Sequence, residues 1–426
     1  MRSFDTGTVH IIGAGLAGLA AAVRLSDSGR AIIVHEATNQ PGGRCRSYYD
    51  QQSGMVIDNG SHLVLSGNHA VLDYARTVGG AATLNELKPE FPFVDLASKA
   101  RWVLRFNEGM VPWWVFNKSA RVPDTKPADY LRLARLLWAS EDKPLRDVID
   151  CEGVLYERLL EPLFLAALNI KPKDGSVKLA SRLVRETLAL GGQACHPVIA
   201  REGIGKAFVE PALTWLGARG VTVALQHALH ALEFDGARVS ALEFADGTVP
   251  LGSADRVILA VPAYAAQNFI AGLTAPSSFR GIVNAHFRID PPKDAPAMIG
   301  LINAMSEWIF AFEDRVAVTI SDGGEWFDTP REKLAADIWR EVAEVLNMPA
   351  DLPADLPPWQ IVRERRATFA ATPEENGKRP GPATRWNNLY LAGDWTDTGL
   401  PATLESAVRS GNAAAELVHA SGRVAA

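Results

Sequence analysis

Two glycine-bearing segments near opposite ends of the chain most constrain its fold. The first, VHIIGAGLAG, occupies residues 9–18, and the second, LYLAGDW, occupies residues 389–395. Each begins as a short apolar run, which is typical of a buried parallel strand, and then reaches glycine where a turn would follow. A chain that starts and ends on such turns is expected to fold around one large nucleotide cofactor.

The first segment has the spacing of a dinucleotide-binding βαβ unit. Gly13 permits a sharp turn, Gly15 lets the backbone approach a pyrophosphate, and Gly18 lets the helix pack closely on the strand. A second predicted strand then ends at Glu36. An acid about 20 residues past the glycines binds ribose hydroxyls and repels a 2′-phosphate, which favours FAD or NAD over NADP.

The sequence QPGGRCR at residues 40–46 distinguishes these two cofactors. Its two glycines, Gly42 and Gly43, free the backbone to lie close to a ligand. Arg44 then offers a planar guanidinium with five donors to phosphate or flavin oxygens. The alternative is a surface turn with a solvated arginine. The position directly after the βαβ unit favours FAD.

These motifs, together with Gly393-Asp394 and the run ESAVRSG at residues 405–411, resemble those of the FAD-dependent amine oxidase and carotenoid desaturase superfamily. Within it, residues 9 to about 418 most resemble the squalene-associated FAD-dependent desaturases. The segments DNGSH at 58–62 and RRATF at 365–369 belong to that likeness.

The resemblance implies which residues would hold FAD. They are Gly13, Ala14, Gly15 and Gly18 at the pyrophosphate, Glu36 at the ribose, Gly43 and Arg44 on the flavin side, Leu229 at the adenine, Gly393 and Asp394 at the ribityl phosphate, and Thr403, Leu404 and Glu405 beside the flavin ring. The segment 220–225 would pair with the strand of Leu229. Some relatives attach the flavin to a cysteine near the C-terminus; because none follows Cys195, we expect non-covalent FAD.

Composition narrows the class of protein. At 426 residues the chain exceeds the roughly 250–300 residues that one core serves, so two domains are expected. A net charge of −6 argues against a nucleic-acid partner. The three cysteines show neither metal spacing nor a disulfide framework, so we expect no metal site and a reducing, cytoplasmic location. No apolar segment is long enough to predict a membrane span.

The pattern predicts an α/β fold with two domains. A Rossmann-like FAD-binding domain, with a parallel sheet and a β-meander, would comprise residues 1–75, 200–265 and 380–426. The insertions 76–199 and 266–379 would form an α+β substrate-binding domain. Predicted strands are 222–225, 228–234, 239–244 and 256–261 in the first domain and 279–289, 298–302 and 309–320 in the second insertion; predicted helices are 16–28, 130–138, 179–190 and 329–346.

Eleven tryptophans are many for this length, and several cluster at residues 101–106 and 111–116, followed by Lys118 and Arg121. Aromatic groups beside cations suit a membrane interface or the mouth of an apolar tunnel. Burial in an ordinary core is the alternative. Our hypothesis is peripheral contact with the inner face of the membrane.

The residues for catalysis are harder to identify. Amine oxidases of the superfamily carry a tyrosine two residues before the glutamate of the C-terminal motif, where this chain has Thr403, which argues against amine oxidation. The resemblance makes His62 the first candidate for a polar group near the flavin, and Arg366 is a second. A turn histidine and a solvated strand face are the respective alternatives.

The expected function is that of an FAD-dependent oxidoreductase on a long apolar isoprenoid. The resemblance implies reductive removal of the hydroxyl group of hydroxysqualene to give squalene, in squalene and hopanoid biosynthesis. A carotenoid (phytoene-type) desaturase or isomerase is the alternative, because the residues do not reveal the direction of electron flow. A non-catalytic prenyl-binding module is a remote alternative. The sequence has no second dinucleotide motif that would bind a nicotinamide cofactor, so it does not identify the electron donor.

Overall fold

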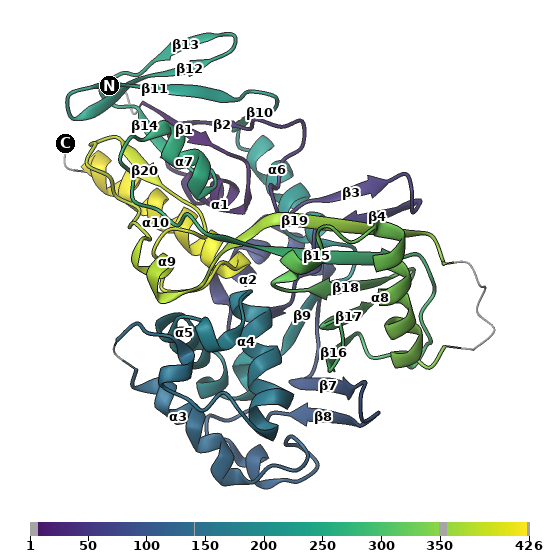
Figure 1. Cartoon of the computed structure of the whole chain (residues 1–426). Helices are drawn as coiled ribbons and strands as arrows, with labels where there is room; N and C mark the ends of the chain where they lie inside the picture. The colour runs from purple at the N-terminus through teal and green to yellow at the C-terminus, as the bar shows by residue number, and fades with distance from the viewer. Residues whose placement is uncertain (1–6, 140, 349–355, 424–426) are drawn as a thin grey trace.

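The two glycine segments lie in one parallel five-stranded sheet. The computed structural model, which describes residues 7–139, 141–348 and 356–423, places this sheet at one end of the molecule (Figure 1). Its order is β10 (Thr222–Ala224), β2 (Ala31–His35), β1 (Thr8–Ile12), β14 (Arg256–Leu259) and β20 (Leu389–Leu391). All four neighbouring pairs are parallel. Segments from the start, middle and end of the chain therefore build one sheet, and the expected α/β fold class is confirmed.

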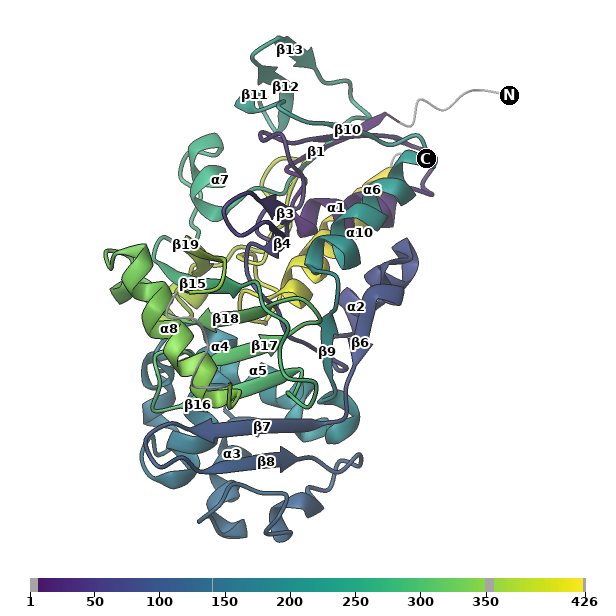
Figure 2. The same cartoon turned by 90° about the vertical axis from the view of Figure 1, so that its right-hand side faces the viewer.

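Two helices lie side by side against this sheet. The alanine-rich α1 (Leu16–Leu25) follows the first glycine turn, and α10 (Leu404–Arg423) follows the second (Figure 2). A Cβ at Gly411 would clash with the carbonyl oxygen of Ala17, so glycine permits their close packing. Helices α2 (His69–Val78) and α6 (Glu210–Gly217) pack beside them. The predicted helix 16–28 is three residues too long, because Ser26 ends α1.

The β-meander is a separate antiparallel sheet of β11 (Leu229–Asp235), β12 (Arg238–Phe244) and β13 (Gly247–Pro250). The expected pairing of segment 220–225 with the strand of Leu229 is wrong, because β10 pairs with β2 instead. Gln226 takes a positive φ of 54°, and the His227 N–H donates to the Glu36 carbonyl oxygen, so the chain turns away between β10 and β11. The predicted strand 256–261 corresponds to β14 (Arg256–Leu259), which lies in the parallel sheet. The third strand of the meander is β13 instead.

A seven-stranded sheet occupies the other half of the molecule. Its order is β19 (Trp359–Phe369), β15 (Phe279–Phe287), β18 (Val316–Ile320), β17 (Trp308–Ala311), β16 (Met298–Ile302), β7 (Glu90–Asp95) and β8 (Arg101–Arg105). Strands β16 and β7 pair in parallel, so both insertions contribute to one sheet. The single strand predicted over 309–320 is a hairpin, because a turn closed by Phe312 and Arg315 separates β17 from β18.

Helices cover both faces of this sheet. Helix α8 (Arg331–Val345) packs on one face against Ile309 and Val318. The neighbouring Trp308 and Phe310 point to the opposite face, as strand alternation requires. On that side lie α3 (Leu131–Leu137), α4 (Glu161–Leu168) and α5 (Val177–Glu186) (Figure 1). The helix predicted over 179–190 ends at Glu186, because Thr187 leaves the helical conformation.

Shorter elements connect the two halves. They are the hairpin β3 (Ser47–Asp50) and β4 (Met55–Asp58), the small sheet of β5 (Val64–Leu65), β9 (Pro197–Ala200) and β6 (Leu84–Glu86), and helices α7 (Ala263–Phe269) and α9 (Pro373–Gly377). Within the described ranges, every helix is too short or too polar to span a bilayer. The domain boundaries stay a prediction, and their ends at 1–6 and 424–426 lie outside the described residues.

Candidate active site

One large cavity joins the two halves of the molecule. Its volume is about 1090 Å³, and its wall includes Gly15 and Glu36 at the parallel sheet and Phe93 and Trp308 on the seven-stranded sheet. Pockets for drug-sized ligands measure roughly 300–1,000 Å³, so this cavity is as large as the largest of them. Of the predicted FAD contacts, all line the cavity except Ala14 and Gly18, which lie behind the first turn.

The first glycine turn leaves open space above its backbone. A Cβ at Gly18 would clash with the Gly13 carbonyl oxygen, and Gly13 has a φ of 106°, so both positions require glycine. At Gly15 an added Cβ would meet no described atom within 4 Å. Gly15 also begins α1 without a side-chain cap, which leaves N–H groups of the first turn for a ligand. This open cradle fits a pyrophosphate.

Glu36 ties this turn to the next segment. One carboxylate oxygen accepts the Ala14 N–H at 2.9 Å, and the other accepts the N–H and hydroxyl of Thr38 at 2.9 and 2.8 Å. A carboxylate offers about four lone-pair positions, so Glu36 can still accept a ribose hydroxyl. Leu229 lines the same end of the cavity although its strand lies in the meander. The sequence predicted the ribose role of Glu36 but not its hold on the glycine turn.

Arg44 forms an ion pair that the sequence did not predict. Its Nη2 donates to Oδ1 of Asp394 at 2.7 Å, and its Nη1 donates to the carbonyl oxygen of Ala367. Burial opposes the charge of Arg44, but the Asp394 carboxylate outweighs it and raises the pKa of the guanidinium. Gly43 precedes it with a φ of 57°. Arg44 and Asp394, which were each expected to contact FAD, thus position one another. Arg44 still has further N–H groups that can donate to a ligand.

The second glycine turn is fixed by α10 and Trp395. A Cβ at Gly393 would clash with the Trp395 ring, and the Gly393 N–H donates to the Ser410 hydroxyl at 2.8 Å. Thr403 caps the start of α10, because its hydroxyl accepts the Ser406 N–H at 3.1 Å. Leu404 begins the helix and lines the cavity. The side chain at position 403 is thus a helix cap and brings no aromatic ring to the cavity.

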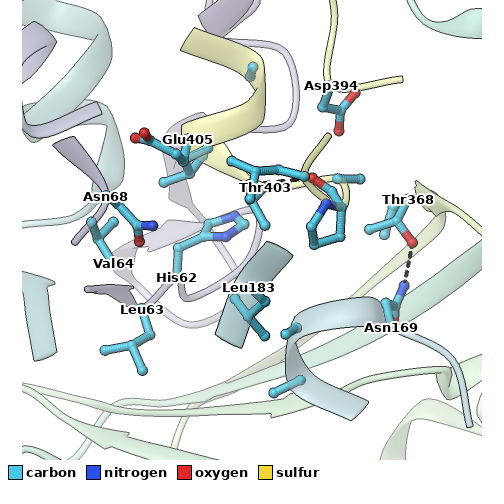
Figure 3. A pocket seen from close by; sticks show the side chains of 18 of the residues that line it. His62, Leu63, Val64, Asn68, Asn169, Leu183, Thr368, Asp394, Thr403 and Glu405 are labelled. Atoms are coloured by element: carbon cyan, nitrogen blue, oxygen red, sulfur yellow. Dashed lines mark hydrogen bonds between the residues drawn. The ribbon is translucent and has the colours of Figure 1, made fainter. Parts of the chain in front are cut away.

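Glu405 has a structural partner outside its own helix. Its carboxylate accepts the N–H groups of Ala70 and Val71 at 3.1 and 2.8 Å, at the start of α2, and it pairs with Arg409 at 2.8 Å. Figure 3 shows this carboxylate pointing away from Thr403. The residue lines the cavity, but its charge is used to anchor α2.

His62 and Arg366, the two catalytic candidates, both line the cavity. The His62 ring lies near Thr403 and Asn68 (Figure 3). Burial, assisted by the Arg44 charge, lowers the pKa of His62 to about 4, so the ring is neutral at pH 7. Arg366 is exposed and places its guanidinium 4.4 Å from the centre of the Tyr264 ring. His62 can form hydrogen bonds in the cavity, but it holds no acidic proton at neutral pH.

A group of polar residues in the cavity wall was not identified from the sequence. Asn169, which ends α4 with a φ of 51°, donates from Nδ2 to the Thr368 hydroxyl at 2.9 Å (Figure 3). Ser321 lies beyond the end of β18 and lines the cavity as well. An asparagine after an apolar helix is typical of a C-terminal cap, which was the only signal in the sequence.

Aromatic side chains form the wall away from the nucleotide end. Phe93 and Phe106 lie there with Trp114, which is half-buried and packs edge-on against Tyr130. Trp113 differs from its neighbour because 65% of its surface is exposed. The two adjacent tryptophans therefore have different environments, one in the cavity wall and one at the surface.

The two cysteine thiols that line the cavity are poor nucleophiles. Burial raises the pKa of Cys195 to about 12 and that of Cys45 further, so both cavity-lining thiols are protonated and weakly nucleophilic at neutral pH. Among the described residues there is no group of three or more histidine, cysteine, aspartate or glutamate side chains placed to hold a metal ion.

Comparisons with known proteins place the chain in a family. Residues 16–419 match the family described as flavin containing amine oxidoreductase. Hydroxysqualene dehydroxylase of Rhodopseudomonas palustris is 56% identical over 98% of this chain and 99% of that protein, and hydroxysqualene dehydroxylase of Sinorhizobium fredii is 52% identical over 96% and 97%. Cyclohexylamine oxidase from Brevibacterium oxydans, 15% identical, shares the fold with a TM-score of 0.72 over 97% and 99% of the two chains.

These matches decide between the cofactors that the first glycine turn left open. A flavin family that covers nearly the whole chain, together with the open cradle at Gly15, identifies the cofactor as FAD. The chain also shares its fold with cyclohexylamine oxidase, as the structural similarity shows. The chain belongs to the flavin containing amine oxidoreductase family and, within it, to the hydroxysqualene dehydroxylases.

Proposed function

We propose that this oxidoreductase removes the hydroxyl group of hydroxysqualene reductively and releases squalene. The observation that carries the proposal is one cavity that joins a cradle for FAD to an apolar, aromatic wall. The relatives named hydroxysqualene dehydroxylase support the substrate, because their similarity covers almost the full length of both chains. A long isoprenoid alcohol is apolar except at one oxygen, and such a cavity suits it.

The residues of this chain would prepare the reaction in several ways. We propose that the FAD contacts predicted from the sequence hold the cofactor, which supplies a hydride when it is reduced. The aromatic faces of Trp308 and Phe310 would exclude water and favour a cationic carbon. His62 would orient polar groups as a neutral hydrogen-bonding ring, and Arg366, stacked on Tyr264, is the weaker candidate.

Anaerobic product analysis tests the proposed reaction. FAD-loaded protein is incubated with hydroxysqualene and dithionite, and the extract is analysed by mass spectrometry for squalene. We expect squalene with the reductant and none in a matched sample with oxidised FAD. A parallel incubation with phytoene tests the desaturase or isomerase alternative. Conversion of phytoene without any squalene from hydroxysqualene would replace our proposal by that alternative.

A purified protein without bound flavin would favour the remote alternative of a prenyl-binding module. The retained cavity-lining residues Gly43, Arg44, Asp394 and Glu405 argue against it. We expect a yellow protein whose flavin is released by denaturation, in keeping with non-covalent FAD. Flavin that stays with the denatured chain would contradict this expectation.

We also propose that the enzyme binds the inner face of the membrane peripherally, with the cavity mouth towards the lipid. Six exposed apolar side chains lie in two segments that also line the cavity, residues 110–116 and 131–138, and we call them the mouth patch: Met110, Val111, Trp113, Phe116, Leu131 and Trp138. Met110, Phe116 and Leu131 also line the cavity. Exposed Lys118 and Lys126 lie in the same segments and would meet anionic headgroups.

Vesicle flotation tests this membrane proposal. Vesicles of phosphatidylcholine and phosphatidylglycerol should float the wild type, and a Trp113→Ser/Trp138→Ser variant should float at least several-fold less. Tyr49→Ser is the matched control, since Tyr49 is equally exposed on β3 but lies outside the mouth patch. The membrane proposal fails if wild type and double variant float equally, or if neither floats.

A further inference from the structure

Three buried polar residues interrupt the wall of the cavity beside the flavin-side segments. We call Asn169, Ser321 and Thr368 the polar corner; each exposes less than a tenth of its surface, and all three line the cavity. They come from the end of α4, the segment after β18, and β19. Burial of polar groups is costly unless they are hydrogen-bonded, so their partners indicate what they are for.

Two hydrogen bonds fix the Asn169 side chain and leave the hydroxyl proton of Thr368 free to be donated. The Oδ1 of Asn169 accepts the Asp322 N–H at 2.6 Å, and its Nδ2 donates to the Thr368 hydroxyl oxygen at 2.9 Å. No described residue accepts the proton of that hydroxyl. A threonine hydroxyl can donate while it accepts, so Thr368 can offer its proton to an oxygen in the cavity.

Thr368 also lies next to the flavin-side ion pair. The carbonyl oxygen of its neighbour Ala367 accepts from Arg44, which pairs with Asp394. In Figure 3, Thr368 and Asp394 both lie to the right of His62. A hydroxyl group bound at Thr368 would therefore lie beside the segments that are expected to hold the flavin.

A partly buried carboxyl group, that of Glu307, lies next to this corner. Glu307 accepts the Ser321 N–H at 2.9 Å, and the Ser321 side chain lies beside the same carboxyl group. Burial raises the pKa of Glu307 to about 7, and the charge of Asp322 adds to this effect. Asp322 is itself paired with Arg280 at 3.3 Å. Glu341, from α8, accepts the N–H groups of residues 305 and 306 nearby.

We propose that the polar corner binds the hydroxyl group of the substrate, and that Glu307 supplies through Ser321 the proton with which this hydroxyl leaves. The inference rests on the proposed dehydroxylation. In that reaction the carbon–oxygen bond breaks, and the oxygen takes the proton and departs as water. The carbon would receive a hydride, with its two electrons, which reduced FAD would supply when bound. Glu307 is left as a carboxylate and regains a proton from solvent.

Substitution of Thr368 by valine tests recognition of the hydroxyl. This change keeps the branched shape and removes the donor. Binding is measured in oxidised, FAD-loaded protein by quenching of tryptophan fluorescence, which Trp114 and Trp308 in the cavity wall should report. Loss of one hydrogen bond should weaken hydroxysqualene binding roughly tenfold and leave squalene binding unchanged.

Thr319→Val provides a matched control. Thr319 also lines the cavity, but its hydroxyl already donates to Oδ1 of Asn284 at 2.9 Å. We expect this variant to keep the wild-type preference for hydroxysqualene over squalene. Equal loss of both lipids in Thr368→Val would mean that only the cavity shape had changed and would overturn the hydroxyl site. Failure of wild type to bind either lipid would instead contradict the proposed function.

Glu307→Gln tests the proton source, because the amide keeps an oxygen for Ser321 but has no acidic proton. General acids typically contribute 10²- to 10⁴-fold, so we expect kcat to fall about 100-fold while hydroxysqualene affinity stays constant. The wild-type donor is protonated below its pKa, so kcat should decrease as pH rises above about 7, and the variant should lack this decrease. A variant with wild-type kcat and pH profile would remove Glu307 from the reaction.

Discussion

The two ends of the cavity are built from different parts of the polypeptide. At the nucleotide end, the lining groups are mainly backbone: the turn at Gly13, the open face of Gly15 and the start of α1. At the substrate end they are side chains such as Phe93 and Trp308. A site made of backbone depends on a particular φ and a missing Cβ, whereas a site made of side chains depends on volume and can be changed one residue at a time.

This comparison predicts that a single added methyl group separates FAD binding from folding. In Gly15→Ala the φ of −69° is compatible with alanine, and the new Cβ meets no described atom within 4 Å. The methyl group would occupy the space proposed for the pyrophosphate. We expect FAD affinity to fall about 100-fold, about 2.7 kcal/mol, with an unchanged melting temperature of the apoprotein. Flavin absorbance per protein and thermal unfolding measure the two effects.

Gly217→Ala is the control for this variant. Gly217 also has no described atom within 4 Å of an added Cβ, but it lies at the end of α6 and does not line the cavity. It should bind FAD as the wild type does. If Gly15→Ala also retains FAD, the nucleotide end is not formed by the open backbone of this turn.

The same difference explains what the sequence could predict. Backbone sites require fixed residue types at fixed spacing, so the turn after β1, the helix α1 and the position of Glu36 could be predicted from local pattern. The route of the chain after β10 could not be predicted, because it depends on one positive φ at Gln226 and on backbone hydrogen bonds to the carbonyl oxygens of Glu36 and Thr38.

Contacts between side chains far apart in sequence were beyond prediction for another reason. Arg44 meets Asp394 across 350 residues, and Asn169 meets Thr368 across 199. Each partner has an ordinary local sequence, and only the packing of the insertions against the parallel-sheet half brings them together. The glycine turns therefore predicted a dinucleotide cofactor, while the groups that would recognise a substrate became visible only in the folded chain.

A second prediction concerns a buried histidine in the sheet of the substrate half. Burial, with a contribution from Arg315, lowers the pKa of His286 to about 4. Between pH 6.5 and pH 4, His286 binds a proton in the unfolded chain but not in the folded chain. The free energy of unfolding therefore falls as the pH drops from 6.5 towards 4. At pH 5 this histidine should cost about 2 kcal/mol of unfolding free energy. In His286→Leu, denaturant unfolding should show a correspondingly shallower loss between pH 7 and pH 5.

Phe287→Leu separates this titration from lost packing. Phe287 is the next residue on β15, is fully buried and does not titrate in this range. Its substitution should lower stability by the same amount at pH 7 and pH 5. Parallel pH profiles for wild type and His286→Leu would show that His286 does not set the acid sensitivity of this region.

The last prediction tests whether the substrate end can be changed without affecting the nucleotide end. Ala167, on α4, lines the cavity near Asn169, so a phenylalanine there would fill space intended for the isoprenoid. We expect Ala167→Phe to weaken hydroxysqualene binding about tenfold, about 1.4 kcal/mol, and to leave FAD content unchanged, the reverse of Gly15→Ala. Ala218→Phe, on the exposed surface after α6, should alter neither. Lower FAD content in Ala167→Phe would mean that the two ends share one binding space, because a side chain on α4 would then reach the volume that the glycine turns define.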